Sequence, residues 1–156
     1  PMWGVSYLEF IATGNVESQG LSRLEETLEE GIRRVKGTRI RLGLSPHAPN
    51  SVSRNAYMRA IELAKRFDLP LTTHLSETVE ERDFIAAATG PQRELLESLG
   101  IWNEQVLREV GHGKTPVEHL EPILNYGDFS AVHLNLLSNT DIRIILDSKT
   151  ATVFCP

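Results

Sequence analysis

Three histidines and one glutamate of this sequence end or follow runs of β-favouring residues. His47 lies in SPHAPNSVS, His74 and Glu77 lie in LTTHLSET, and His133 lies in AVHLN. A carboxylate three residues from a histidine can act as a general acid and base beside a metal-activated water. These four residues are therefore the candidates for hydrolytic chemistry.

Each of the candidates could instead have an ordinary structural role. His74 stands among apolar neighbours in its strand, so that a buried histidine with satisfied hydrogen bonds is about as well supported as a catalytic one. Glu77 could be an acid at a helix start, where the helix dipole favours a carboxylate. That interpretation suits Glu80 and Glu81, and it suits Glu77 less well.

The other histidines and the one cysteine carry weaker signals. His47 could brace its proline-rich loop, and His133 taken alone would more often be structural. His112 and His119 have no metal-ligand spacing to other residues, and we assign them to surface or helix packing. Cys155 lacks a partner and an activating neighbour, which indicates a buried and inert thiol.

The elements that must position these residues alternate between strand and amphipathic helix. Apolar residues at three- and four-residue steps predict the helices, and β-favouring runs predict the strands. The segment at about 90–127 shows little periodicity, and we interpret it as an inserted helical loop. The expected strands are Val5–Ile11, Thr38–Leu44, Leu69–Leu75, Phe129–Asn135 and Ala151–Phe154.

Hydroxyl residues mark the expected helix starts. Ser22 with Glu25, and Thr78 with Glu81, have the spacing of a capping box, in which the hydroxyl and the acid each bind a backbone N–H group. Ser53 can cap the helix that follows the proline-rich loop.

The alternation predicts a parallel sheet covered by helices. Periodicity does not distinguish an open, doubly wound sheet from a closed barrel. The candidate residues follow successive strands at their carboxyl ends, which is typical of the active face of a TIM barrel. A Rossmann-type sheet would need a glycine-rich first turn, and the sequence contains no GxGxxG. We therefore expect an α/β fold of the TIM-like (β/α)₈ type.

The composition is typical of a soluble globular protein: 40% of the 156 residues are hydrophobic and 24% are charged. The net charge of −5 argues against nucleic-acid and acidic-membrane partners, because no basic stripe could neutralise phosphates. No apolar run approaches the roughly 20 residues that span a bilayer. The single cysteine excludes an internal disulfide framework and indicates a cytoplasmic location. Homo-oligomerisation stays open.

Taken together, SPHAPNSVS, LTTHLSET, AVHLNLLS and ATVFCP resemble the amidohydrolase superfamily. Within it they are similar to the cytosolic aminohydrolases: methylthioadenosine/S-adenosylhomocysteine, guanine and aminofutalosine deaminases, and triazine chlorohydrolases. The pairing of PHAP with HLSET at this distance is the specific part of the likeness. The resemblance covers nearly the whole chain and implies strands three to seven of a metal-dependent hydrolase barrel, so about five strands of a partial barrel.

The resemblance also implies a role for each candidate residue. His74 becomes the metal ligand from the fifth barrel strand and binds one Zn²⁺ or Fe²⁺ ion. Glu77 shuttles protons to the ring nitrogen and to the departing ammonia. His133, on the sixth strand, orients the attacking hydroxide or the leaving group. His47 contacts the substrate, through a ribose hydroxyl in the nucleoside deaminases.

Some parts that the family carries do not occur in this sequence. Family members have an HxH pair on the first strand and an aspartate on the eighth, whereas this sequence contains no HxH. Asp141 and Asp147 lie in the helix after the fourth expected strand, so neither can replace that aspartate. Catalytic zinc normally has three protein ligands, of which this chain offers one. We therefore expect residues 1–156 to be the central part of one barrel domain whose N- and C-terminal parts are missing.

The predicted activity of the full-length protein is the hydrolytic deamination of an adenine nucleoside or a related amino-heterocycle. The isolated segment is expected to be inactive. One alternative is a truncated or inactive barrel fragment, and another is the hydrolysis of a C–Cl or amide bond by the same machinery. A binding protein without chemistry is a further alternative, against which the presence of His74, Glu77 and His133 argues.

Overall fold

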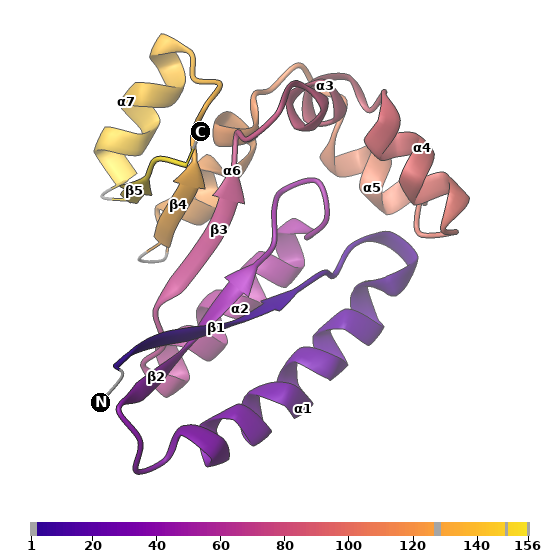
Figure 1. Ribbon diagram of the computed structural model, residues 1–156. Helices are drawn as coiled ribbons and strands as arrows, with labels where there is room; N and C mark the ends of the chain where they lie inside the picture. The colour runs from indigo at the N-terminus through magenta and orange to yellow at the C-terminus, as the bar shows by residue number, and fades with distance from the viewer. Residues whose placement is uncertain (1–2, 127–128, 149, 156) are drawn as a thin grey trace.

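The computed structural model describes residues 3–126, 129–148 and 150–155, and its centre is one parallel sheet. Neighbouring strands of the sheet are also neighbours along the chain (Figure 1). A doubly wound sheet would reverse its strand order at a switch point, so this uninterrupted order is that of an arc of a barrel. The strands are β1 (Gly4–Phe10), β2 (Ile40–Pro46), β3 (Leu71–Leu75), β4 (Phe129–His133) and β5 (Ala151–Val153).

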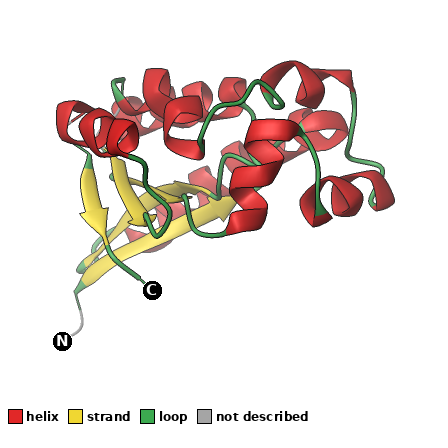
Figure 2. Ribbon diagram, turned by 90° about the horizontal axis from the view of Figure 1, so that it is seen from above, coloured by secondary structure: helices red, strands yellow, loops and turns green. Residues whose placement is uncertain are grey.

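Helices connect the strands, and most of the helical mass lies to one side of the sheet (Figure 2). Within the described ranges, no helix is both long and apolar enough to cross a membrane. The helical elements are η1 (Gly14–Val16), α1 (Glu17–Val35), α2 (Arg54–Phe67), α3 (Val79–Ala87), α4 (Pro91–Ser98), α5 (Glu104–Glu109), α6 (Pro116–Leu124) and α7 (Asn139–Ser148).

Burial alternates along β3 and shows which face of the sheet carries the core there. In β3, Leu71, Thr73 and Leu75 are buried, whereas Thr72 and His74 are half-buried. Side chains of a strand alternate between the two faces of a sheet, so the buried set faces the helices. His74 therefore points to the opposite face, which the core does not fill.

The main core lies between the sheet and the helices and gives the site a rigid base. Tyr57 packs edge-on against Phe129, with the ring centroids 6.2 Å apart. The hydroxyl groups of Tyr57 and Thr73 are 2.7 Å apart and hydrogen-bonded, so neither is left unsatisfied inside the core. Other fully buried members of this core are Leu28, Leu44, Leu75, Val117, Leu120 and Leu124.

The described part of the connection between β3 and β4 contains four helices and a small core of its own. Helices α4, α5 and α6 lie in the segment that we interpreted as an inserted helical loop, whose last residue, Gly127, is outside the described residues. Helix α6 packs into the main core. Helices α3, α4 and α5 enclose a second cluster: Phe84, Ile85, Ala88, Leu96, Val106 and Val110.

Hydrogen bonds fasten this insertion to the turn after β1. The Asn15 backbone N–H donates to the Ile101 carbonyl at 2.9 Å, and the Asn15 side chain donates to the Gly100 carbonyl at 2.9 Å. Asn103 donates in turn to the Asn15 side-chain oxygen at 3.0 Å. Gly14 is required at this contact, because a Cβ there would lie 2.1 Å from the Ile101 carbonyl oxygen. The insertion therefore covers one side of the carboxyl edge of the sheet.

Two of the three expected helix starts differ from the structure. Ser53 caps α2 as expected and accepts the Ala56 N–H at 3.1 Å. The capping box at Ser22 is wrong, because η1 runs directly into α1 and Ser22 lies inside that helix. Thr78 caps α3, but the Glu81 carboxylate binds other N–H groups than that of Thr78.

Helix α6 contains a titratable group that is buried in its neutral form. His119 is 1% exposed, and burial, reinforced by the nearby Arg54 charge, lowers its pKa to about 3. The unfolded chain takes up this proton near pH 6.5, whereas the folded chain does not. The free energy of unfolding should therefore fall as the pH drops from about 6.5 toward 3, by up to about 1.4 kcal/mol per pH unit.

The measurement compares denaturant unfolding of the wild-type protein and of His119→Gln between pH 7.5 and pH 4.5. For each protein, the free energy of unfolding is plotted against pH. The difference between the two slopes gives the contribution of His119, even if the variant is less stable at every pH. His112→Gln is the matched control, because it makes the same substitution at an exposed histidine of the same insertion. Equal slopes for all three proteins would contradict a buried neutral His119.

Candidate active site

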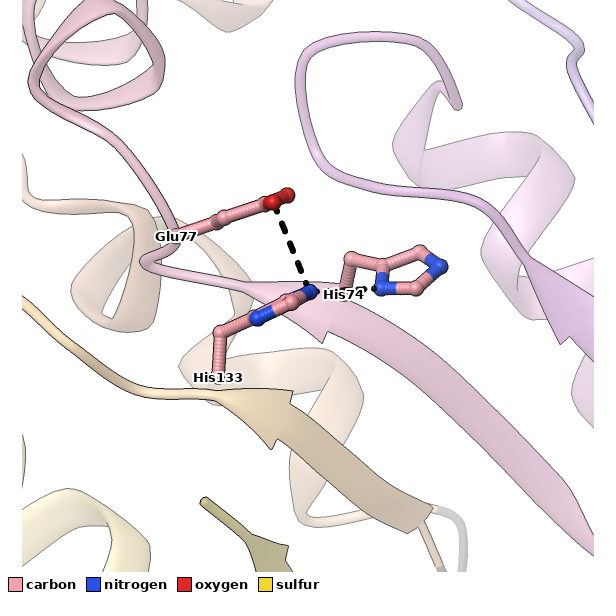
Figure 3. A group of neighbouring side chains, drawn as sticks. All are labelled: His74, Glu77 and His133. Atoms are coloured by element: carbon pink, nitrogen blue, oxygen red, sulfur yellow. Dashed lines mark hydrogen bonds and ion pairs between the residues drawn. The ribbon is translucent and has the colours of Figure 1, made fainter. Parts of the chain in front are cut away.

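The structure brings His74, Glu77 and His133 together at the carboxyl ends of β3 and β4 (Figure 3). The His74 Nδ1 atom lies 3.1 Å from the His133 Nε2 atom, and the same His133 atom lies 3.6 Å from Glu77 Oε1. Three ligand atoms, one from each residue, lie within 4.8 Å of one another. The sequence-based grouping of these three residues thus corresponds to a real cluster.

His133 reaches the cluster because its backbone departs from the strand. His133 is paired with Leu75, so alternation would turn its side chain toward the helices, as for Ala131. Instead its φ is 81°, in the left-handed region that non-glycine residues rarely adopt, and Leu134 follows at 55°. This conformation ends β4 two residues before the expected boundary and directs the imidazole toward His74.

Glu77 sits on a turn that is hydrogen-bonded to the turn after β4. The Ser76 carbonyl accepts the N–H groups of Asn135 and Leu136, at 3.0 and 3.2 Å. The Ser76 hydroxyl donates to the Leu136 carbonyl at 2.7 Å, and the Asn135 side chain donates to the Glu77 carbonyl at 3.3 Å. The backbones that carry Glu77 and His133 are therefore fixed relative to each other.

His47 lies next to the cluster, with its ring centroid 5.3 Å from that of His74. Its carbonyl accepts the His74 N–H at 2.8 Å, which ties the proline-rich loop to β3. The Ser51 hydroxyl donates to the Ala48 carbonyl and therefore accepts from His47 Nδ1, 2.6 Å away. Burial lowers the pKa of His47, so that the ring is neutral and its Nε2 atom is an acceptor.

Sequence reasoning missed two acids that belong to the site. The Glu9 Oε2 atom lies 3.2 Å from the His74 Nε2 atom, and Glu9 comes from the carboxyl end of β1. The rule that singled out the histidines applies equally to an acid in VSYLEF, so the signal was present. Glu81 is 3% exposed beneath Glu77, and burial raises its pKa although backbone N–H groups stabilise its charged form. The capping-box spacing from Thr78 pointed to Glu81 rather than to the exposed Glu80, but it predicted only a role at the helix start.

The donor set of the cluster fits a divalent transition metal. Two imidazole nitrogens and a carboxylate oxygen are the ligand types that Zn²⁺ and Fe²⁺ take in catalytic sites. His74 offers one ring nitrogen to the cluster while its other nitrogen faces the Glu9 carboxylate, as in the carboxylate-supported histidines of metal sites. His74 is thus the member best placed to be a ligand.

Two further residues considered from the sequence, Asp141 and Cys155, lie outside the cluster. Asp141 is fully buried and accepts hydrogen bonds from the Thr115 hydroxyl at 2.5 Å and the Ser138 N–H at 2.7 Å, so it joins α6 to α7. The expected burial of Cys155 is wrong: its side chain is exposed, because β5 packs on the sheet only through β4. Its backbone carbonyl lies 2.9 Å from His133 Nδ1, which holds that ring.

Sequence comparison relates the chain to deaminases. It is 24% identical over 154 residues to the 5-methylthioadenosine/S-adenosylhomocysteine deaminase of Pyrococcus furiosus, covering 94% of this chain and 31% of that protein. It is 28% identical over 169 residues to the aminodeoxyfutalosine deaminase of Deinococcus radiodurans, covering 98% and 38%. The chain therefore spans about a third of the length of these relatives. No family model matches it.

Solved structures share the fold of this chain. The aminofutalosine deaminase of Helicobacter pylori, in complex with methylthio-coformycin, superposes with a TM-score of 0.78 at 21% identity, covering 97% of this chain and 36% of that one. An adenosine deaminase of Xanthomonas campestris with bound zinc gives a TM-score of 0.58 at 20% identity, covering 99% and 30%. The five-stranded sheet is thus a partial TIM-like barrel, as expected.

Proposed function

We propose that this chain is the central part of a metal-dependent aminohydrolase of the amidohydrolase superfamily, because its sequence and its fold are similar to those of deaminases. The full-length protein would hydrolytically deaminate an adenine nucleoside or a related amino-heterocycle. The observation that carries this proposal is the convergence of His74, Glu77 and His133 at the carboxyl ends of adjacent strands. The names of the relatives, which are deaminases of adenosine derivatives, support the substrate class.

In the proposed site His74 is the ligand of a zinc or iron ion that family members hold with further residues. Such an ion, when bound, lowers the pKa of a coordinated water toward neutrality and so supplies hydroxide at physiological pH. The zinc-bound relative supports the metal dependence, and the three clustered ligand atoms of this chain are compatible with it. Glu9 holds the His74 ring in place through its other nitrogen.

Glu77 moves the protons of the reaction. Deamination forms a bond from water oxygen to the ring carbon and breaks the bond to the amino nitrogen, which leaves as ammonia. The Glu77 carboxylate takes one proton from the attacking water and gives it to the ring nitrogen, and it then carries the second proton of that water to the amino group, which leaves as ammonia while the carbonyl forms. His133 Nε2, 3.6 Å from Glu77 Oε1, is placed to orient the attacking oxygen or the leaving group.

His47 contributes to substrate binding beside the reacting groups. Its neutral ring presents Nε2 as an acceptor, which complements a hydroxyl donor such as one of a ribose. The adjoining turn after β1 and the insertion fastened to it border the same edge of the sheet, where loops commonly determine specificity. We further propose that the enzyme is cytoplasmic, because its single cysteine fits a reducing compartment, and that its substrate is a small molecule like those that name the relatives.

The test measures ammonia release by the full-length protein that contains this segment. Adenosine, 5′-deoxyadenosine, methylthioadenosine and guanine are the substrates, and a chlorotriazine with chloride detection represents the alternative chemistry. We expect ammonia from at least one purine compound, together with about one metal ion per site by elemental analysis. Chloride release without ammonia would favour the chlorohydrolase alternative. A metal-loaded protein that releases neither would overturn the proposal.

A further inference from the structure

The Glu81 carboxylate occupies an unusual place for an acid in the first turn of a helix. Its Oε1 atom accepts the Ser76 N–H at 3.0 Å, and its Oε2 atom accepts the Glu77 N–H at 2.7 Å. Both N–H groups precede α3, so the side chain folds back past the helix start. We propose that Glu81 is a positioning residue, which holds the backbone of Glu77 in the orientation that aims its carboxylate at His133.

Burial distinguishes Glu81 from its neighbours on the same helix. Glu81 is 3% exposed, whereas Glu80 is exposed and has no such contacts in the described part of the chain. A carboxylate is costly to remove from water unless hydrogen bonds compensate for the lost hydration. The N–H groups of Ser76 and Glu77 supply that compensation, and no cation among the described residues forms an ion pair with the carboxylate. The buried Glu81 carboxylate therefore depends on its hydrogen bonds to this turn.

The turn needs such a support because its backbone is strained. Ser76 has a φ of 56°, in the left-handed region, where a non-glycine residue is unfavourable by about 1 kcal/mol or more. The Ser76 carbonyl is held by the N–H groups of Asn135 and Leu136. Glu81 holds the N–H side of the same turn, so that the turn is clamped between α3 and the segment that follows His133.

Removing the clamp should therefore affect Glu77 through its backbone. Glu81 touches neither His74 nor His133 in any hydrogen bond of the described residues, so metal binding should persist in its variants. A displacement of a catalytic group by about 1 Å can lower a rate by about 10²-fold. The expected effect on turnover rests on the proposed function. The expected effect on the N–H groups of Ser76 and Glu77, which lose their acceptor, does not.

The experiment compares Glu81→Gln, Glu81→Ala and the matched control Glu80→Gln in the full-length protein. Glutamine keeps the shape of Glu81 but turns an NH₂ group toward one of the two backbone N–H groups, so one bond is lost. Alanine loses both. We expect kcat to fall about 10-fold in Glu81→Gln and about 10²-fold in Glu81→Ala, with KM within about threefold, unchanged metal content and a wild-type Glu80→Gln.

Amide hydrogen exchange of Ser76 and Glu77 provides a readout that is independent of activity. We expect faster exchange at these two positions in both Glu81 variants and unchanged exchange at the α2 and β3 core amides. Faster exchange with unchanged kcat would overturn the positioning role, and so would unchanged exchange. A general loss of metal and of core protection in Glu81→Gln would assign Glu81 to stability alone and also overturn it. If the protein deaminates no substrate, the exchange result still decides whether Glu81 holds the turn.

Discussion

Glu77→Gln is expected to lower the kcat of the full-length enzyme by about 10²- to 10⁴-fold while the bound metal remains. Glutamine has the shape of the glutamate side chain but cannot accept and return a proton near neutral pH. The Glu77 carboxyl is about half exposed and lies 3.6 Å from His133 Nε2, so the amide should fit without disturbing the backbone. Turnover is followed as ammonia release, and metal content by elemental analysis of the same sample.

Glu80→Gln is the control for the loss of one negative charge near the site. Glu80 lies three residues farther along and is exposed, so its variant should keep the activity of the wild type. A Glu77→Gln enzyme with substantial activity would contradict the assignment of the proton shuttle. A Glu77→Gln protein that is both inactive and free of metal would mean that Glu77 is a metal ligand. The experiment must distinguish this alternative, because Glu77 belongs to the three-residue cluster.

The main elements of the fold could be predicted because local sequence and tertiary packing agree in them. The expected strand Leu69–Leu75 and the observed β3 (Leu71–Leu75) end at the same residue, since the β-favouring run and the buried alternation coincide. Ser53 caps α2 because its hydroxyl suits the N–H groups that begin any helix at that point. Such signals are local, and they require no knowledge of what packs where.

The features that could not be predicted depend on contacts between distant segments. The Ser22 capping box failed because η1 already provides the turn that starts α1, so the local motif had no function to perform. The direction of the His133 side chain follows from a positive φ that the hydrogen bonds of Leu134 and Asn135 with Leu75 and Ser76 stabilise. No sequence rule predicts a left-handed histidine.

The candidate site could also be predicted only in part from the sequence. His74, Glu77 and His133 follow successive strands, and parallel strands bring their carboxyl ends to one edge, so their proximity follows from topology. The capping-box spacing singled out Glu81 but predicted the wrong partner for its carboxylate, the Thr78 N–H group. Its partner N–H groups precede the helix, and only the folded turn between β3 and α3 presents them to it.

His74→Ala is expected to reduce the metal content of the full-length protein to well below half of its sites. Losing a support residue around a metal ligand typically costs 10- to 100-fold in affinity, and loss of a ligand itself should cost at least about that much. His74 is the member whose second ring nitrogen faces a supporting carboxylate, that of Glu9, so we expect the other two members not to compensate for its loss. Metal content after dialysis against a weak chelator is the direct measurement.

Thermal unfolding with and without chelator separates metal loss from a general defect. A ligand that binds only the folded state raises the Tm by mass action, so the wild-type Tm should fall when the metal is removed. The Tm of His74→Ala should show little further change, because that site is already largely empty. His112→Ala, which alters an exposed histidine of the insertion, should behave as the wild type. If the His74→Ala protein keeps its full metal content and a chelator-sensitive Tm, His74 is not a metal ligand. The ligand would then be His133, Glu77 or Glu9, whose carboxylate faces the His74 ring.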